Sequence, residues 1–395
     1  MLDDMQVDDR KTVVFAAGGT SGHIHPALAI ASEIRDNNPD VRIIFCGLAG
    51  NIEEEMVPAA GYEFVPISAR AMPSKYYPWF YRWLKDNIHG IRTTRKLIKK
   101  LKPILVIGTG GYVTGPVIMA ASQLKTPYVL HEQNVYPGRA NRFFAKHAAH
   151  VFVINEKSKE NLGDLATITV SGNPVQPIFY NLDKEQGRHA IGISEDRFLL
   201  VVTGGSLGAE RLNKAISGLR DHHGWQQLVK DHPELMIMLS TGKDQPNNPE
   251  IYEGISNVQV TNYLYNMAQW MAASDLVISR SGAMTCAELM ALAKPAILVP
   301  YPHAIDDHQS KNAQSLAELG GAIMIKDADF NTEYLIDRIR YFINRPERLL
   351  QMTKALSSAE MPPAAKVIYQ KIAPYLSDKD NGDNEQSKKK QQRRS

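Results

Sequence analysis

The chain has 395 residues, of which 44% are hydrophobic and 22% are charged, a composition typical of a folded globular protein. Its net charge of +3 is too small to indicate a nucleic-acid partner. No apolar run approaches the ~18 residues of a membrane span, and the acidic first residues lack the apolar centre of a signal peptide. Cys46 and Cys286 are expected to be buried free thiols. Because no membrane span is predicted, any membrane contact should be peripheral.

Short apolar runs alternate with amphipathic stretches along the whole chain. The predicted strands are Thr12–Ala17, Val41–Cys46, Ile104–Gly108, Tyr128–His131, Val151–Ile154, Phe198–Thr203, Met236–Ser240, Leu276–Ser279, Ala296–Pro300 and Ala322–Lys326. Helical patterns such as Pro26–Arg35 and Met284–Ala293 lie between them. This alternation predicts an α/β protein with parallel sheets covered by helices on both faces.

The opening of the chain is repeated near its middle. VVFAAGGTSGHIHPALAIA begins near residue 13 and LLVVTGGSLGAERLNKAI near residue 199, and each reads as strand, glycine turn and helix. Any α/β protein has glycines after strands, but two matching openings favour two doubly wound domains. We expect these domains at 11–172 and 173–360, a helix at 361–376 that returns to the first domain, and a disordered basic tail at 377–395.

The first glycine turn, Gly18–His23, suits a ligand that approaches the backbone and the start of a helix. Its spacing differs from the dinucleotide fingerprint, and the strand VRIIFCG ends without an acidic residue, which argues against an NAD enzyme. Pro26 is expected in the first turn of the helix. His23 is placed to act as a general base, although a structural histidine explains it equally well.

The second half offers two further anion sites. Gly204–Gly208 opens it without a P-loop motif, and Ser206 adds a hydroxyl. Downstream, Gly282 makes a turn after a strand, and Glu288 follows about one turn into the next helix. Its carboxylate can accept hydrogen bonds from vicinal ribose hydroxyls, and Arg280 can add positive charge.

Polar loops also follow two strands of the first half, at 108–116 and at His131–Asn134. Ligands bind at the carboxyl ends of such strands, so a cleft between the domains would hold a donor on one side and an acceptor on the other. The segment 76–83 packs six aromatic residues into eight positions, and basic residues follow at 92–102. This pattern is typical of a membrane interface; the alternative is core packing beside a solvated helix.

Together these motifs resemble the glycosyltransferase family 28 enzymes that convert lipid I to lipid II in peptidoglycan synthesis. The resemblance covers roughly residues 11–372 and rests on GGTSGHIHPALAIA, GTGGYVTGP, HEQN, SGNPV, GGSLGA, SRSGAMTCAE and DDHQSKNA. It implies a GT-B fold, in which two Rossmann-like domains face a central cleft. It further implies inverting transfer of N-acetylglucosamine from UDP-N-acetylglucosamine to the muramyl 4-hydroxyl of lipid I, at the cytoplasmic face of the bacterial membrane.

The resemblance also assigns residues to roles. The catalytic residues it implies are His23 and Glu132. The donor-binding residues are Thr20, Ser21, Gly22, Asn134, Ser206, Leu264, Arg280, Ala283, Met284, Thr285, Cys286, Ala287, Glu288 and Gln309. The acceptor-binding residues are Gly110, Gly111, Tyr112 and His131, and the membrane residues are Trp79, Phe80 and Trp83. The chain departs from the family at Gln176, where some members carry arginine.

The implied partners are UDP-N-acetylglucosamine, undecaprenyl-linked lipid I, an anionic membrane surface and other cell-wall synthesis proteins. No protein-bound metal or other cofactor is expected, because no DxD-type motif falls in a site loop. The alternatives are a diacylglycerol glycosyltransferase, a UDP-N-acetylglucosamine 2-epimerase or a non-catalytic nucleotide-binding scaffold. The aromatic–basic segment argues against the epimerase, and the presence together of His23, Glu288 and Gln309 argues against the scaffold.

Overall fold

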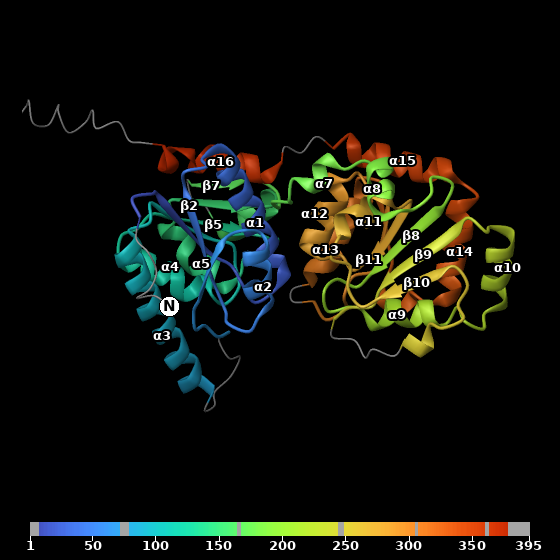
Figure 1. Cartoon of the computed structure of the whole chain (residues 1–395), viewed down its shortest axis with the longest axis horizontal. Coiled ribbons are helices and arrows are strands. Elements are labelled where there is room, and N and C mark those ends of the chain that lie inside the picture. Colours follow the sequence, from blue (N-terminus) through green and yellow to red (C-terminus); the bar gives the residue numbers. More distant parts are fainter. Residues whose placement is uncertain are drawn as a thin grey trace, which may run out of the picture.

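The computed structural model describes residues 8–71, 79–163, 167–243, 249–304, 307–359 and 363–377. It contains two parallel β-sheets, each with helices on both faces, and the two sheets lie side by side along the long axis of the molecule (Figure 1). The predicted α/β class with two doubly wound units is confirmed.

The N-terminal half carries a seven-stranded sheet in the order β3-β2-β1-β4-β5-β6-β7. Its strands are β1 Thr12–Ala16, β2 Arg42–Gly47, β3 Glu63–Pro66, β4 Leu105–Gly108, β5 Tyr128–Glu132, β6 His150–Val153 and β7 Ile168–Val170. Its helices are α1 Ser21–Asn37, α2 Ile52–Ala59, α3 Trp79–Leu101, α4 Thr114–Gln123, α5 Arg139–Phe144 and α6 Glu156–Leu162.

The C-terminal half carries a six-stranded sheet in the order β10-β9-β8-β11-β12-β13. Its strands are β8 Phe198–Thr203, β9 Leu235–Ser240, β10 Val258–Thr261, β11 Leu276–Ser279, β12 Ala296–Leu298 and β13 Ala322–Met324. Its helices are α7 Ile178–Asn181, α8 Lys184–Ile191, α9 Glu210–Ser217, α10 His223–Asp231, α11 Met267–Ala273, α12 Ala283–Ala291, α13 His308–Glu318, α14 Thr332–Ile343 and α15 Pro346–Ser357.

The strand order reverses at the first strand of each sheet, which fixes where a ligand can bind. β1 lies between β2 and β4, and β8 lies between β9 and β11. Neighbouring connections leave such a strand in opposite directions, which opens a crevice at its carboxyl end. The glycine-rich loops that follow β1, β4, β8 and β11 therefore all lie at switch points.

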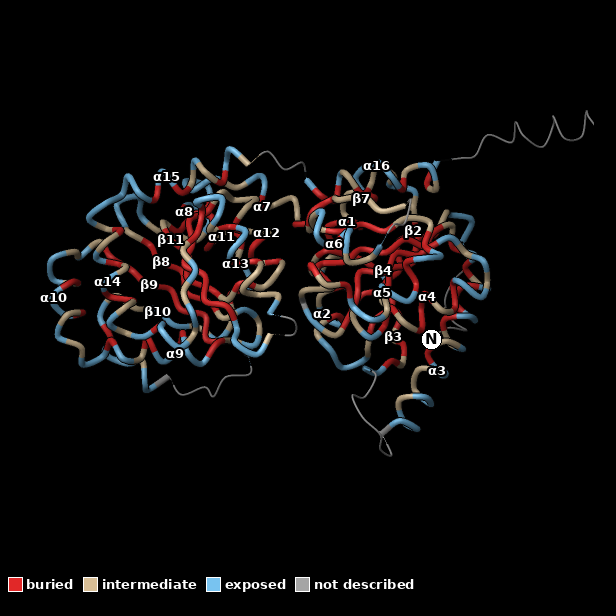
Figure 2. The backbone as a smooth tube through the Cα atoms, turned by 180° about the vertical axis from the view of Figure 1, so that it is seen from behind, coloured by how far each residue is buried: buried red, intermediate tan, exposed pale blue. Residues whose placement is uncertain are grey.

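The last helix, α16 (Ala364–Leu376), packs against α1 in the N-terminal half (Figure 1). Ile368 and Ile372 enter the apolar cluster beneath α1, and Lys11 Nζ donates to the Leu376 carbonyl at 2.9 Å. The central strands of both sheets are buried almost throughout, as Figure 2 shows in red. The chain thus passes between the halves twice, once after β7 and once after α15.

The structure differs from the sequence prediction in two respects. Strands β3, β7 and β10 were not predicted; all three lie at sheet edges and are at most partly buried, so they lack a continuous apolar run. Pro26 does not lie in the first turn of its helix, because α1 already begins at Ser21 after the extended Thr20. Pro26 has no N–H to donate to the Gly22 carbonyl one turn back.

Candidate active site

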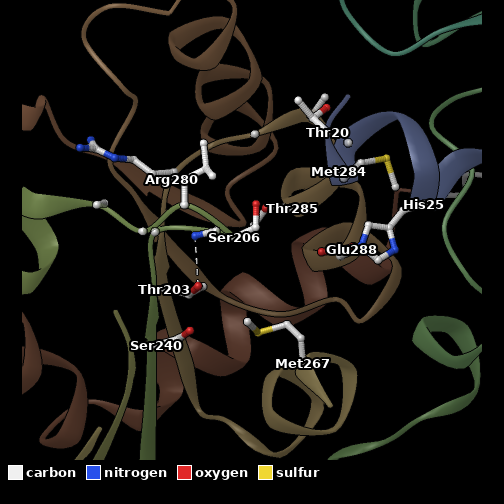
Figure 3. A pocket seen from close by; sticks show the side chains of 18 of the residues that line it. Thr20, His25, Thr203, Ser206, Ser240, Met267, Arg280, Met284, Thr285 and Glu288 are labelled. Carbon is white, nitrogen blue, oxygen red and sulfur yellow. Dashed lines mark hydrogen bonds between the residues drawn. The ribbon is translucent and has the colours of Figure 1, made fainter. Parts of the chain in front are cut away.

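A cavity of about 1410 Å³ lies between the two halves of the molecule. Its wall combines the loops after β1, β8 and β11 with the first turns of α1, α9 and α12, and Figure 3 shows part of it. Typical small-molecule sites measure ~300–1,000 Å³, so this cavity has room for a nucleotide-sugar together with the end of a second substrate.

Most of the predicted donor residues line this cavity. They are Thr20, Gly22, Asn134, Ser206, Leu264, Arg280, Ala283, Met284, Thr285, Glu288 and Gln309. Ser21 opens α1, but its side chain lies outside the described part of the structure. Cys286 and Ala287 do not line the cavity, because their positions on α12 turn toward the apolar cluster of the C-terminal half. Burial there raises the pKa of the Cys286 thiol to about 12.

His23 lines the cavity with its ring in a defined orientation. Its Nδ1 lies 3.2 Å from the Thr109 carbonyl oxygen and 3.3 Å from Oε1 of Gln133. Both neighbours can only accept, so Nδ1 carries the hydrogen and Nε2 keeps its lone pair. Desolvation lowers the pKa of His23, opposed by the nearby Glu132 carboxylate and by these hydrogen bonds. The ring is therefore a neutral base near pH 7.

His131 acts on His23 through Gln133 and does not reach the cavity. Gln133 Nε2 donates to His131 Nδ1 at 3.1 Å, and His131 Nε2 in turn donates to the Gly172 carbonyl at 3.0 Å. Burial lowers the pKa of His131 to about 4, so the ring is neutral. The structure thus places His131 in a buried hydrogen-bond chain behind His23, away from the acceptor wall where the sequence placed it.

Glu132 is likewise absent from the cavity wall. Its Oε1 accepts the Asn134 backbone N–H at 3.0 Å, and its Oε2 accepts Gly138 N–H at 2.8 Å and Asn141 Nδ2 at 2.9 Å. These donors occupy both oxygens and shape the loop after β5. The charge of Glu132 nevertheless raises the pKa of His23.

Two helices of the C-terminal half begin at the cavity wall without a side-chain cap. Neither Ala209, which precedes α9, nor Gly282, which precedes α12, caps its helix with a side chain. The first N–H groups of both helices are thus available to an anion. Thr203 Oγ1 accepts the Gly205 N–H at 3.1 Å and fixes the glycine loop before α9, shown by the dashed line in Figure 3.

Glu288 projects from α12 into the same cavity (Figure 3). Among the described residues, none donates a hydrogen bond or forms an ion pair with its carboxyl group. Desolvation therefore raises the pKa of Glu288 to about 8. A carboxyl group held this way is ready for a ligand that brings its own donors, such as a pair of hydroxyls.

Two predicted donor residues are engaged by the protein itself. Arg280 Nη1 contacts Asp327 Oδ1 at 2.6 Å and the Val299 carbonyl at 3.1 Å, and in Figure 3 its guanidinium points away from Glu288. Gln309 Oε1 accepts the Tyr301 N–H at 2.9 Å, which leaves its amide N–H₂ as the donor toward a ligand. The charge of Arg280 at this site is thus partly neutralised.

The predicted acceptor loop lies beside the cavity and not in its wall. Gly110 and Gly111 have φ angles of 100° and 80°, and a β-carbon on Gly111 would clash with the Gly18 carbonyl. A β-carbon on Gly110 would come within 2.6 Å of His23 Nδ1. Glycine is therefore needed at both positions, and the loop supports the turn that carries His23. The Tyr112 side chain is half exposed next to Gly19.

Sequence reasoning missed several residues of the cavity wall. His25 lines it two residues after His23, and its Nδ1 lies 3.4 Å from Nε2 of Gln176, which also lines it. Tyr263 and Tyr265 flank Leu264, and the Lys243 ammonium lies 4.6 Å from the centre of the Tyr263 ring. The sequence feature that could have identified His25 is its position near the start of the helix that follows the first glycine turn.

The first turns of α3 expose apolar side chains beside basic ones. Phe80, Tyr81, Leu84 and Ile88 are all exposed, and the Phe80 ring packs 5.4 Å from the half-buried Trp83 ring. The Trp79 side chain and residues 72–78 lie outside the described part of the structure. Within the described ranges, no helix is both long and apolar enough to cross a bilayer, and no three His, Cys, Asp or Glu side chains gather as metal ligands.

Comparison with known proteins identifies the family. The glycosyltransferase family 28 N-terminal and C-terminal domain models match residues 13–153 and 199–368. A curated UDP-N-acetylglucosamine–N-acetylmuramyl-(pentapeptide) pyrophosphoryl-undecaprenol N-acetylglucosamine transferase from Acetivibrio thermocellus is 34% identical over 94% of this chain and 100% of its own length. A transferase of the same name from Desulfitobacterium hafniense is 35% identical, over 90% of this chain and 97% of its own. This chain belongs to that transferase family.

Solved structures agree with a GT-B fold. MurG of Acinetobacter baumannii superposes with a TM-score of 0.66 at 24% identity, covering 92% of this chain and 99% of its own. The UDP-GlcNAc 2-epimerase of Neisseria meningitidis, solved with UDP-GlcNAc bound, superposes with a TM-score of 0.64 at 16% identity, covering 92% and 100%. At these identities the likeness concerns the fold, and the transferase family follows from the sequence relatives.

Proposed function

We propose that this chain transfers N-acetylglucosamine from UDP-N-acetylglucosamine to the muramyl 4-hydroxyl of lipid I and so forms lipid II. The observation that carries the proposal is one cavity with two functional groups: a neutral imidazole with an unprotonated Nε2, on His23, and a carboxyl group, on Glu288, that has no partner among the residues the structure describes. The first suits deprotonation of a hydroxyl, and the second suits binding of a nucleotide ribose. The names of the relatives add the identity of both substrates.

The donor occupies the C-terminal wall in this proposal. Glu288 accepts hydrogen bonds from the ribose hydroxyls, and the backbone of Leu264 contacts uracil. The diphosphate lies across the starts of α9 and α12, where helix N–H groups and dipoles stabilise negative charge. The amide of Gln309 faces the N-acetylglucosamine ring. The donor itself requires no resident cofactor in this scheme.

Catalysis then proceeds by direct displacement. The muramyl 4-hydroxyl attacks the anomeric carbon on the face opposite UDP, which inverts that centre and gives a β-1,4 linkage. His23 Nε2 takes the hydroxyl proton, while Gln133 holds the opposite side of the ring. UDP leaves as an anion, and the same helix ends that bind the diphosphate stabilise its developing charge.

The lipid acceptor reaches the N-terminal half from the membrane. Phe80, Trp83 and the other aromatic and apolar side chains of the first turns of α3 lie at the lipid headgroups, and the basic residues that follow meet anionic lipid. Trp79 belongs to the same segment by sequence. The enzyme thereby works as a peripheral protein on the cytoplasmic face of the membrane, with Gly110, Gly111 and Tyr112 near the acceptor's path.

A transfer assay tests the proposal directly. Purified protein is given radiolabelled UDP-N-acetylglucosamine and a short-chain lipid I analogue, with UDP-glucose and UDP-N-acetylgalactosamine in parallel. Labelled lipid II and free UDP are expected with the first donor only. His189, exposed on α8 and remote from the cavity wall, provides a matched His→Ala control for His23→Ala. Epimerised UDP-sugar, or tight UDP binding without any transfer, would contradict the proposal.

Membrane docking is tested separately by sedimentation with vesicles. We expect binding to phosphatidylglycerol vesicles and little binding to phosphatidylcholine vesicles. Phe80→Ser with Leu84→Ser should weaken sedimentation but spare transfer to a water-soluble acceptor. Leu350, exposed on α15 of the other half, gives the matched control Leu350→Ser. Equal sedimentation of the control and the α3 variant would refute docking through α3.

A further inference from the structure

The donor cavity contains an imidazole for which the proposed chemistry has no role. His25 extends from α1 into the wall, and α1 packs directly against α12, which carries Glu288. His25 and Glu288 both line the cavity, each from one of these two packed helices, and both are labelled in Figure 3. Gln176 Nε2 lies 3.4 Å from His25 Nδ1, and an amide N–H can only donate, so Nδ1 accepts and Nε2 carries the hydrogen.

The empty cavity favours an uncharged pair at this contact. Burial raises the pKa of Glu288 to about 8 and lowers the pKa of His25 below its ordinary value of 6.5. Near pH 7 the carboxyl group therefore keeps its proton and the imidazole remains neutral. Neither group forms an ion pair with any other residue that the structure describes.

The cations of the wall are already committed to carboxylates of the protein. Lys214 lies 2.6 Å from Glu210, and Arg280 and Arg211 lie 2.6 Å and 3.4 Å from the two oxygens of Asp327. These carboxylates therefore largely balance the positive charge that the cavity wall could offer to a diphosphate. Other titratable groups also face this cavity or lie beside Glu288. They are His23 on α1, Tyr263 and Cys286 beside Glu288, and Tyr265, Tyr301, His303 and His308 elsewhere along the wall.

A nucleotide changes the preference of both groups at once. Ribose hydroxyls that donate to Glu288 stabilise its carboxylate, because a carboxylate accepts hydrogen bonds that a protonated carboxyl accepts poorly. The negative diphosphate stabilises a cation in the same cavity, and His25 is a group there that can acquire charge without breaking an ion pair.

We propose that binding of the nucleotide moves one proton from the carboxyl group of Glu288 to the imidazole of His25. The O–H bond of Glu288 breaks and an N–H bond forms at Nδ1 of His25, directly or through water, so a neutral pair becomes an ion pair. Gln176 then turns its amide to present Oε1 to the new N–H. His25 thereby becomes the cation that binds the diphosphate, and the protein exchanges no net proton with solvent. The inference rests on the proposed donor site.

Calorimetry with UDP measures this proton directly. Titration at pH 7 in buffers of different ionisation enthalpy gives the number of protons exchanged on binding. The full chain should exchange close to none. His25→Phe, which leaves Glu288 to lose its proton to solvent, should release close to one proton, and Glu288→Gln should take up close to one. His189→Phe, on the exposed face of α8, is the matched control and should behave as the unmodified chain.

Nuclear magnetic resonance supplies the second readout. The His25 imidazole signals, assigned by their loss in His25→Gln, should move to imidazolium values when UDP saturates the protein at pH 7. Release of a proton by the unmodified chain, or neutral His25 signals in the UDP complex, would overturn the inference while leaving the donor site intact. Absence of UDP binding to the unmodified chain would instead overturn the proposed function. Thermal unfolding of each variant checks that it folds.

Discussion

The Nδ1 atom of His23 lies 3.3 Å from Oε1 of Gln133, and this contact decides which nitrogen of the imidazole faces the cavity without a hydrogen. Gln133 is itself held by His131, which lies behind the cavity wall, so the orientation of the base is set partly from outside the cavity. Such support is what keeps a catalytic ring in one tautomer.

Substitutions of Gln133 should move the pH profile of the enzyme in opposite directions. The Gln133 hydrogen bond raises the pKa of His23, so Gln133→Leu should lower that pKa, whereas the carboxylate of Gln133→Glu should raise it. The acid limb of kcat/KM would then shift to lower pH in the first variant and to higher pH in the second. Both should also reduce kcat, because each loses the amide donor that holds residue 133 to the Thr109 carbonyl and to His131. Shifts in the same direction would contradict this role.

His23→Ala should lower turnover by roughly 10²–10⁴-fold if His23 is the general base. Because desolvation lowers the pKa of His23, the unmodified enzyme should keep its base deprotonated down to below pH 6.5. The acid limb of its activity should lie there, and the residual activity of the alanine variant should lack that limb. Initial rates from pH 5 to 8 with the lipid I analogue test both points. Near-normal turnover of His23→Ala would rule the assignment out.

Glu288→Gln should weaken donor binding yet stabilise the empty protein at alkaline pH. The folded-state pKa of Glu288, about 8, exceeds its ordinary value of 4.5, so the native state binds the extra proton. The stability of the unmodified protein should therefore fall as pH rises from about 4.5 to 8. Glutamine carries no such proton and should flatten this part of the curve, with a gain of about 1–2 kcal/mol at pH 8.

Urea unfolding of UDP-free protein at several pH values measures the effect of Glu288→Gln. Cys286→Ser, a variant on the same helix whose side chain faces the apolar cluster, controls for general disturbance of α12. That control should be less stable at every pH but should keep the slope. An unchanged slope in Glu288→Gln would mean that Glu288 is ionised in the empty cavity.

Gly111→Ala should destabilise the N-terminal half and impair catalysis together. A β-carbon there meets the Gly18 carbonyl, and the φ of 80° is unfavourable for alanine. We expect a loss of about 2–4 kcal/mol in unfolding free energy and a lower kcat, because the loop supports the turn that carries His23. Gly50→Ala is the control, since Gly50 has a similar φ of 74° but open space around it. Equal losses in the two variants would show that contact with Gly18 is unimportant.

The parts of the fold that the sequence predicted share one physical property. Buried central strands such as β1 and β8 are continuous apolar runs followed by glycine turns, so they can be recognised from local pattern alone. The edge strands β3 and β10 are partly exposed, and each pairs with a single neighbour, the strand that precedes it in the chain. β3 and β10 therefore lack the continuous apolar run that made the edge strand β13 recognisable from its sequence.

The sequence predicted which loops form the candidate site, but it did not predict the directions in which their side chains point. Placing the loop after β5 near the site was sufficient to find His131 and Glu132, but their inward orientation comes from hydrogen bonds to Gly172 and Asn141. His25 was missed for the opposite reason. Its approach to Glu288 joins two helices from different halves of the chain, and that approach exists only once both halves have folded.

The return of α16 to α1 has a consequence for how this protein is made. Translation delivers β1 through β7 first, but the apolar surface of α1 on which Ile368 and Ile372 pack remains uncovered while the whole C-terminal half is still being synthesised. The C-terminal half, whose elements β8 to α15 are contiguous, can close its own core before that. The half that leaves the ribosome first is therefore the last to be completed, because its core is closed only when α16 has emerged.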